Sequence, residues 1–173
     1  MNLIIKAAQF AHKAHIAQLR KFSGDPYFVH LARVAGRVAA LENTTEEMVA
    51  AAYLHDACED TDAPQVHATE WNEFPCKVQD LVVELTNVYT KLNFSHLNRK
   101  TRKKLETERI GKISQAAKCI KLIDRIDNIE DFKRTGNLEQ YYINESRALL
   151  EVLRGANPDL EKELQNLVGI NGN

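Results

Sequence analysis

The feature that most constrains this chain is the decapeptide AYLHDACEDT, residues 52–61, which ends an Ala- and Val-rich run. Residues 48–54 would cover nearly every face of a helix expected over about residues 45–59, and such a helix usually lies at the centre of its domain. Burying ionisable groups there is costly unless they are paired or bound to a metal. Four such groups follow the apolar run: His55, Asp56, Glu59 and Asp60.

The apolar residues elsewhere recur mainly at helical spacing, and no segment alternates convincingly with period two. The sequence therefore predicts an all-α fold, a compact bundle of about eight helices in one domain spanning residues 1–173. Residues 61–75 are expected to form a loop or short helix, and residues 87–97 are expected to be irregular. Thr44 and Glu47 have the spacing of a capping box. Helices are expected over about residues 3–19, 27–41, 45–59, 76–86, 98–112, 114–133, 138–154 and 158–168.

The composition is that of a soluble globular protein, with 44% apolar and 27% charged residues and a formal net charge of −1. This charge predicts neither a nucleic-acid nor a membrane partner. The three cysteines (Cys58, Cys76 and Cys119) are widely spaced and form no CxxC motif. We therefore expect a cytoplasmic protein without disulfides or a thiolate zinc site. The N-terminal residues resemble no signal peptide, and the oligomeric state is not predicted.

A helix over residues 45–59 would group the four ionisable side chains, because residues four apart share a face. His55 would lie over Glu59, and Asp56 would lie over Asp60. Mixed histidine and carboxylate ligands suit Mn²⁺, Mg²⁺, Fe²⁺ or Zn²⁺. The alternative is that the acidic residues only mark the end of the helix in solvent, because a His-Asp pair alone is a weak motif.

Two further apolar segments contain a similar polar intrusion. Asp124 lies among the isoleucines of IKLIDRIDNIEDF, with Asn128 on the same helical face, and His30 lies in PYFVHLARVA. Each has an ordinary interpretation: His30 as a hydrogen-bonded core histidine, and Asp124 as the partner of Arg125 or another base. One metal centre would explain all three intrusions together.

The order His30, His55-Asp56, Asp124 matches the H…HD…D signature of the HD superfamily of metal-dependent phosphohydrolases. The stretches AHKAHIAQLRKFSGDPYFVHLARVA, AAYLHDACEDT and IKLIDRIDN more closely resemble the hydrolase domain of the Rel/Spo family of alarmone enzymes. That pattern runs AH-x-GQ-x-R-K…PY-x-x-HP…VA, LHD-x-x-EDT and KL-x-DR-x-x-N. The resemblance spans about residues 8–132 and extends to RKTRKKLETERI, which is similar to the free-standing small hydrolases. Since no synthetase domain follows, we expect a small alarmone hydrolase.

Three positions depart from the family pattern without removing a ligand. Ala17 replaces a glycine, Leu31 replaces the proline after the histidine, and Asp127 stands where the long enzymes often carry histidine. Metal binding and hydrolysis are therefore still expected. Asp127 is the departure that could alter nucleotide preference.

The resemblance implies removal of the 3′-pyrophosphate from guanosine 3′,5′-bis(diphosphate) or its 5′-triphosphate form, giving GDP or GTP. It implies one Mn²⁺, or another divalent cation, that activates water and neutralises phosphate charge. Glu59 and Asp60 would act as general base or positioning groups beside that water. The implied metal ligands are His30, His55, Asp56 and Asp124.

Cationic side chains are expected to contact this anionic nucleotide, because arginine can stack on purines and pair with phosphate. The run RKTRKK, residues 99–104, is expected to be a solvated helix face, since Glu106 and Glu108 follow it. The alternative is that it contacts phosphate at the mouth of the pocket. A nucleic-acid site is not expected, because no aromatic residues interleave with the bases. The substrate contacts implied by the resemblance or by helical position are Arg20, Lys21, Asn128 and Tyr141 or Tyr142.

Two other functions stay open. One is an HD hydrolase of a 5′-nucleotide, a cyclic nucleotide or an adenosine-based alarmone. Arg20-Lys21 and the EDT ending argue against general nucleotidases but do not distinguish guanine from adenine. The other is a catalytically silent helical regulator that binds an alarmone or a protein partner. The presence of Glu59 and Asp60 argues against it, because a pure binding protein would not need them.

Overall fold

The computed structural model describes residues 2–169, and of Pro64 only the backbone. Within this range every regular element is a helix, apart from one isolated antiparallel bridge between Leu19 and Pro26. The predicted all-α fold is therefore confirmed. Eight of the described helices have nine or more residues, as expected, and three have only four or five.

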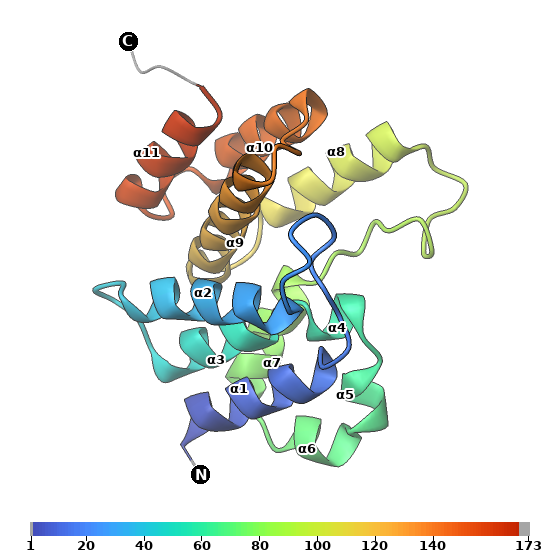
Figure 1. Cartoon of the computed structure of the whole chain (residues 1–173), viewed down its shortest axis with the longest axis vertical. Helices are drawn as coiled ribbons and strands as arrows, with labels where there is room; N and C mark the ends of the chain where they lie inside the picture. Colours follow the sequence, from blue (N-terminus) through green and yellow to red (C-terminus); the bar gives the residue numbers. More distant parts are fainter. Residues whose placement is uncertain (1, 170–173) are drawn as a thin grey trace. The chain divides into compact units, whose positions relative to one another are not determined.

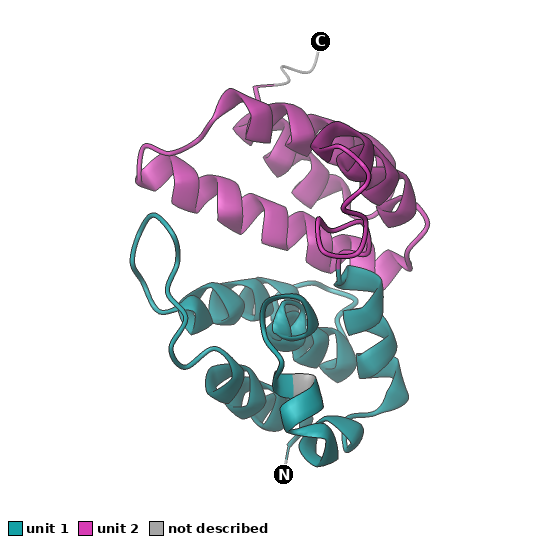
Figure 2. Ribbon diagram, turned by 90° about the vertical axis from the view of Figure 1, so that its right-hand side faces the viewer, with its two compact units in different colours: residues 1–86 teal, residues 87–173 magenta. Residues whose placement is uncertain are grey.

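The chain divides into two compact units, residues 1–86 and 87–173, which are coloured separately in Figure 2. A single domain over residues 1–173 stays a prediction. The first unit is built around α3 (Glu46–Leu54), which packs against α1, α2 and α7 (Figure 1). Six of the nine residues of α3 are buried, which confirms the expected central helix. The other helices of this unit are α1 (Leu3–Ala14), α2 (Tyr27–Ala39), α4 (Ala57–Asp60), α5 (Ala63–Val66), α6 (Ala68–Asn72) and α7 (Cys76–Leu85).

Both ends of α3 differ from the prediction. The N-cap is Thr45, whose Oγ1 accepts a hydrogen bond from the Met48 N–H at 3.3 Å, so the capping box expected at Thr44 is wrong. The helix ends at Leu54 rather than continuing to residue 59. His55 and Asp56 form a turn before α4, although both keep right-handed helical backbone angles.

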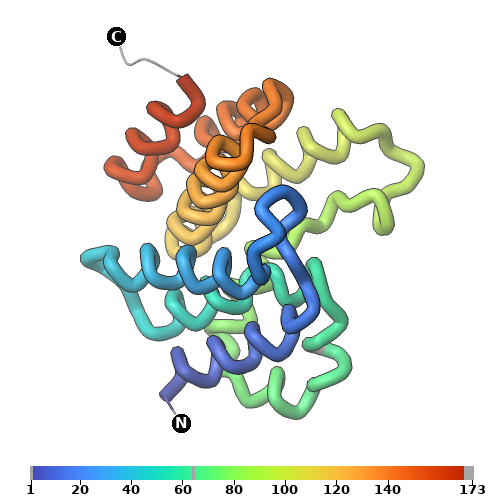
Figure 3. Tube along the Cα trace, viewed as in Figure 1, coloured from blue at the N-terminus to red at the C-terminus, as the bar shows by residue number. Residues whose placement is uncertain are grey.

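The segment between α1 and α2 folds into a narrow loop (Figure 3). Helix α1 ends at Ala14 rather than near residue 19, and its C-cap residue, His15, is only 2% exposed. The loop closes where the Arg20 N–H donates to the Asp25 carbonyl at 2.8 Å. Gly24 has a φ of +72°, a conformation that side chains disfavour. This closure places Tyr27 at the first position of α2.

The second unit is organised around α9 (Gln115–Arg134), which packs against α10 (Gln140–Leu153) and α11 (Pro158–Leu167). Helix α8 (Arg99–Ile110) packs against α10. These four helices agree with the predicted ranges to within two residues. Residues 87–97 contain no helix or strand, as expected.

Candidate metal and catalytic site

Three of the four predicted metal ligands converge in the first unit. His30 lies in α2 with 0% exposure, and His55 lies at the end of α3 with 1% exposure. The His55 Nε2 is 3.1 Å from the Asp56 Oδ2, and the His30 Nε2 is 3.7 Å from the same oxygen. One ligand atom from each of the three residues lies within 4.8 Å of the others.

The hydrogen bond of His55 to its own helix determines what its ring offers to Asp56. The His55 Nδ1 lies 2.8 Å from the Ala52 carbonyl oxygen, which can only accept, so Nδ1 carries the hydrogen. In a neutral ring Nε2 then presents a lone pair to the Asp56 carboxylate. Two acceptors this close require a positive charge between them, either a second ring proton or a metal ion.

The donor set fits a divalent cation. Two imidazole nitrogens and a carboxylate suit Mn²⁺, Fe²⁺ or Zn²⁺. A ligating histidine also commonly donates its other N–H to a carbonyl, as His55 does to Ala52. The two histidine side chains are almost fully buried, whereas the Asp56 side chain is 15% exposed.

Tyr27 is a contact of this cluster that the sequence reasoning did not single out. Its hydroxyl donates to the Asp56 Oδ2 at 2.7 Å. The sequence signal was present in the PY-x-x-H pattern, which places a tyrosine three residues before His30, one turn earlier in α2. Residues three apart on a helix share a face, so Tyr27 and His30 both reach Asp56.

Glu59 and Asp60 lie in α4, and both are exposed. The prediction that they share one continuous helix with His55 and Asp56 is wrong, because the turn at residues 55–56 separates α3 from α4. One helical hydrogen bond spans the junction, from the Asp60 N–H to the Asp56 carbonyl at 2.9 Å. Exposure agrees with the interpretation as a helix end, and it also leaves both acids accessible to a ligand.

An open groove of about 630 Å³ runs beside these two acids. Two of its lining residues are hydrogen-bonded, because the Asp60 Oδ2 accepts from the Gln18 Nε2 at 3.3 Å. The volume lies within the range of small-ligand sites. The groove is lined by Ala14, Ile16, Ala17, Gln18, Glu59, Asp60, Thr61 and Asp62.

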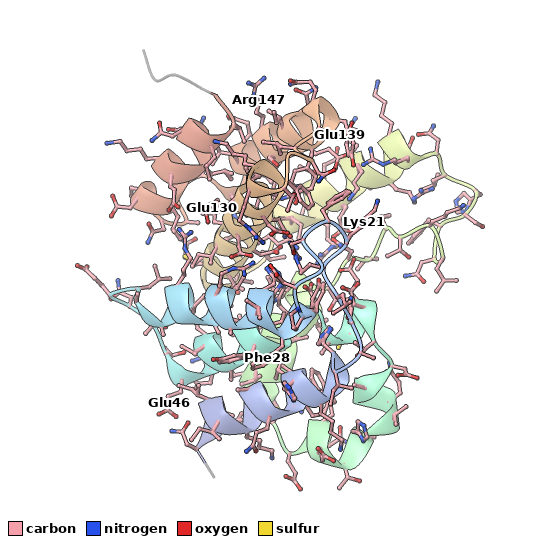
Figure 4. The ribbon with its side chains drawn as sticks, viewed as in Figure 1. Lys21, Phe28, Glu46, Glu130, Glu139 and Arg147 are labelled. Atoms are coloured by element: carbon pink, nitrogen blue, oxygen red, sulfur yellow. The ribbon has the colours of Figure 1, made fainter. Side chains whose placement is uncertain are left out.

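The predicted substrate contacts Arg20 and Lys21 lie in the loop between α1 and α2. Lys21 is labelled in Figure 4. Arg20 is only 8% exposed, and its guanidinium carbon lies 5.5 Å from the centre of the Tyr27 ring. Lys21 is exposed, with its Nζ 4.9 Å from the centre of the Phe22 ring. Arg20 is therefore fixed by packing, whereas Lys21 is open to solvent.

Asp124, the fourth predicted ligand, lies in α9 of the second unit and is 6% exposed. The Lys121 Nζ is 3.1 Å from its Oδ2, and the Asn128 Nδ2 donates to its Oδ1 at 2.6 Å. The ordinary interpretation, an ion pair with a base, is therefore present, and the base is Lys121. Arg125 instead lies over the Tyr142 ring, 4.5 Å from its centre. A shared metal centre that includes Asp124 stays a prediction.

The basic run of α8 is largely exposed, as expected: Arg99, Lys100, Lys103 and Lys104 face solvent. Arg99 pairs with Glu145 at 2.6 Å and stacks over Tyr141, which is 53% exposed. Glu106, expected to support a solvated face, is instead only 7% exposed.

A profile of the HD domain family matches residues 7–153. The chain belongs to the HD domain family. A human relative, guanosine-3′,5′-bis(diphosphate) 3′-pyrophosphohydrolase MESH1, is 33% identical over 95% of this chain and 92% of its own length. The corresponding protein of Drosophila melanogaster is 32% identical, over 94% and 91% of the two chains.

A solved structure, described as a metazoan ortholog of SpoT that hydrolyzes ppGpp, has a similar fold. It superimposes with a TM-score of 0.81 and 31% identity, over 99% of this chain and 97% of that chain. A longer relative, a GTP pyrophosphokinase of Myxococcus xanthus, is 32% identical over 98% of this chain but only 21% of its own length. Among the described helices, none combines the length and apolar character needed to span a membrane.

Proposed function

We propose that this HD protein is a Mn²⁺-dependent hydrolase of guanosine 3′,5′-bis(diphosphate) and its 5′-triphosphate form. The observation that carries the proposal is the buried cluster of His30, His55 and Asp56, in which an imidazole lone pair meets a carboxylate at 3.1 Å. The similarity to relatives that carry this activity in their names supports the choice of substrate.

His30, His55 and Asp56 would hold the cation, and Asp124 of α9 would supply the fourth ligand. The bound cation would lower the pKa of a water molecule and offset negative charge on the phosphate under attack. Glu59 and Asp60 would accept the proton of the attacking water or orient it, since both are exposed beside the groove.

The substrate carries several negative charges, which the protein must offset. Lys21 is exposed in its loop and would pair with phosphate, while Arg20 would offer its guanidinium plane to the base or a phosphate. Asn128 and Tyr141 are proposed as further contacts. Asn128 would then have to keep or exchange its bond to Asp124.

The reaction consumes one water and releases pyrophosphate with GDP or GTP. Residues 1–173 would form one HD hydrolase domain, because the family profile covers most of both units. The three free cysteines are consistent with a reducing, cytoplasmic location.

The decisive test supplies purified protein with Mn²⁺ and a panel of guanosine and adenosine nucleotides that carry a 3′-pyrophosphate. We expect about one metal ion per chain and pyrophosphate release from the guanosine compounds. Glu59→Gln should abolish turnover while keeping the metal, and Glu46→Gln, at an exposed position of α3, should leave turnover unchanged.

Each alternative gives a different result in this assay. Turnover of adenosine compounds alone, or of 5′-monophosphates alone, would reassign the substrate within the HD family. Binding of the guanosine compounds without any turnover in the presence of Mn²⁺ would support the silent regulator. The absence of bound metal would refute the hydrolase proposal altogether.

A further inference from the structure

The Tyr27 ring lies at the centre of a packed group in the first unit. The His15 ring stacks on it, with ring centres 4.9 Å apart and planes inclined by 11°. The Arg20 guanidinium also lies near the ring, and the His30 ring meets its edge with centres 5.6 Å apart. Because these contacts fix the ring, they also fix the hydroxyl that donates to Asp56.

His15 has a second contact, which leads to Asp60. Its Nδ1 lies 2.6 Å from the Gln18 Oε1, and the Gln18 Nε2 donates to the Asp60 Oδ2. Since the amide nitrogen donates to the carboxylate, the amide oxygen must accept from His15. The His15 Nδ1 therefore carries the hydrogen of this bond.

We propose that His15 and Tyr27 are positioning residues that hold two carboxylates of the site through separate contacts. Tyr27 orients Asp56, and His15 orients Asp60 through Gln18 while its ring supports Tyr27. One buried imidazole thereby aligns a proposed cation ligand with a proposed acceptor of the water proton. This inference rests on the proposed function of Asp56 and Asp60.

The hydrogen bond from Tyr27 to Asp56 and the hydrogen bond from Gln18 to Asp60 should differ in strength. The Tyr27 hydroxyl donates to a carboxylate that is only 15% exposed, where few water molecules can replace it. Removing such a hydrogen bond from a ligating carboxylate typically lowers metal affinity or activity by about 10–100-fold. The hydrogen bond from Gln18 is longer and reaches an exposed carboxylate, so its removal should cause a smaller loss of activity.

The first experiment measures Mn²⁺ binding to the metal-free protein by calorimetric titration. We expect Tyr27→Phe to weaken binding by about 10-fold or more. Tyr53→Phe is the matched control, because Tyr53 lies in α3 and stacks on Phe28, outside the proposed contacts. Circular dichroism should show unchanged helix content in both variants.

The second experiment tests the hydrogen bonds that connect His15 through Gln18 to Asp60. We expect Gln18→Leu to lower kcat several-fold and leave Mn²⁺ affinity within about 2-fold of the unmodified protein. His15→Phe keeps an aromatic ring against Tyr27 and should behave like Gln18→Leu. Because the His15 Nε2 has no hydrogen-bond partner among the described residues, only the Gln18 bond is lost. The double variant should be no worse than either single variant.

The outcomes distinguish this inference from the proposed function. If the unmodified protein binds Mn²⁺ and Tyr27→Phe binds it equally well, the positioning role of Tyr27 is refuted and the metal site stands. If the effects of His15→Phe and Gln18→Leu on kcat are additive, the two residues do not act through the same hydrogen-bonded connection to Asp60. If the unmodified protein binds no Mn²⁺, the proposed metal site itself fails.

Discussion

Glu106 provides the sharpest test of how the second unit is held together. Its Oε2 accepts from the backbone N–H groups of Val88 and Tyr89 at 3.0 and 2.9 Å. Its Oε1 accepts from the Nε and Nη2 of Arg109 at 2.8 and 2.6 Å. One buried carboxylate therefore joins α8 to the irregular segment that precedes it.

Glu106→Gln keeps the shape of the side chain but removes the charge and one acceptor. The amide NH₂ must then face either the two backbone donors or Arg109, which leaves buried donors unsatisfied. Breaking a buried ion pair on one side costs about 3–5 kcal/mol. Because the Arg109 side chain is still 22% exposed, we expect the lower end, about 3 kcal/mol.

The measurement is urea unfolding followed by circular dichroism. With an m value of about 2–3 kcal/mol/M, the midpoint should fall by about 1–1.5 M. The control is Glu108→Gln, two residues on, where the side chain is 56% exposed and lies 3.9 Å from Lys104. Loss of this exposed ion pair should lower the free energy of unfolding by less than about 0.5 kcal/mol. Equal midpoints for the two variants would refute the reasoning.

Three further outcomes are expected. Burial raises the pKa of the Cys58 and Cys119 thiols, which lowers their thiolate fraction at pH 8. Both should therefore alkylate more slowly at that pH than Cys76, whose side chain is exposed; peptide mass mapping that finds equal rates in the folded protein would contradict this. Asn157→Ala removes the cap that accepts from two N–H groups of α11 and should cost about 1 kcal/mol in urea unfolding; an unchanged midpoint would show that the cap contributes nothing. Mn²⁺ at about 100 times its Kd should stabilise the protein by about 2.7 kcal/mol in thermal unfolding, and the same gain in Asp56→Ala would place the ion elsewhere.

Local sequence signals were sufficient for most of the helices. Helix α9 combines a Ser114 cap with isoleucines at helical spacing, and its observed range differs from the prediction by one residue at each end. The break after Leu54 was missed because Ala-rich sequence favours helix and both turn residues keep helical backbone angles. The cap was assigned to Thr44 because its spacing to Glu47 matches a capping box, whereas the adjacent Thr45 caps the helix.

The site was predicted only where residues carry a local signal. His30, His55 and Asp56 each interrupt an apolar pattern, and the structure brings them together. His15 and Tyr27 do not interrupt an apolar pattern in the sequence. Their rings stack only because the loop between α1 and α2 closes on itself. Glu106 was expected on a solvated face because its neighbours in sequence are charged. Its carboxylate is instead buried and accepts hydrogen bonds from the backbone amides of Val88 and Tyr89.

The backbone of Glu59 and Asp60 is hydrogen-bonded to the turn between α3 and α4, so its local stability depends on Asp56. The amides of Glu59 and Asp60 both donate to the Asp56 carbonyl, at 3.2 and 2.9 Å. A helix of four residues opens locally at low cost, so these amides should exchange with deuterium far faster than those of buried α3. An ion on the Asp56 side chain would oppose that opening. Amide exchange in α4 would then report occupancy of the metal site in the absence of any substrate.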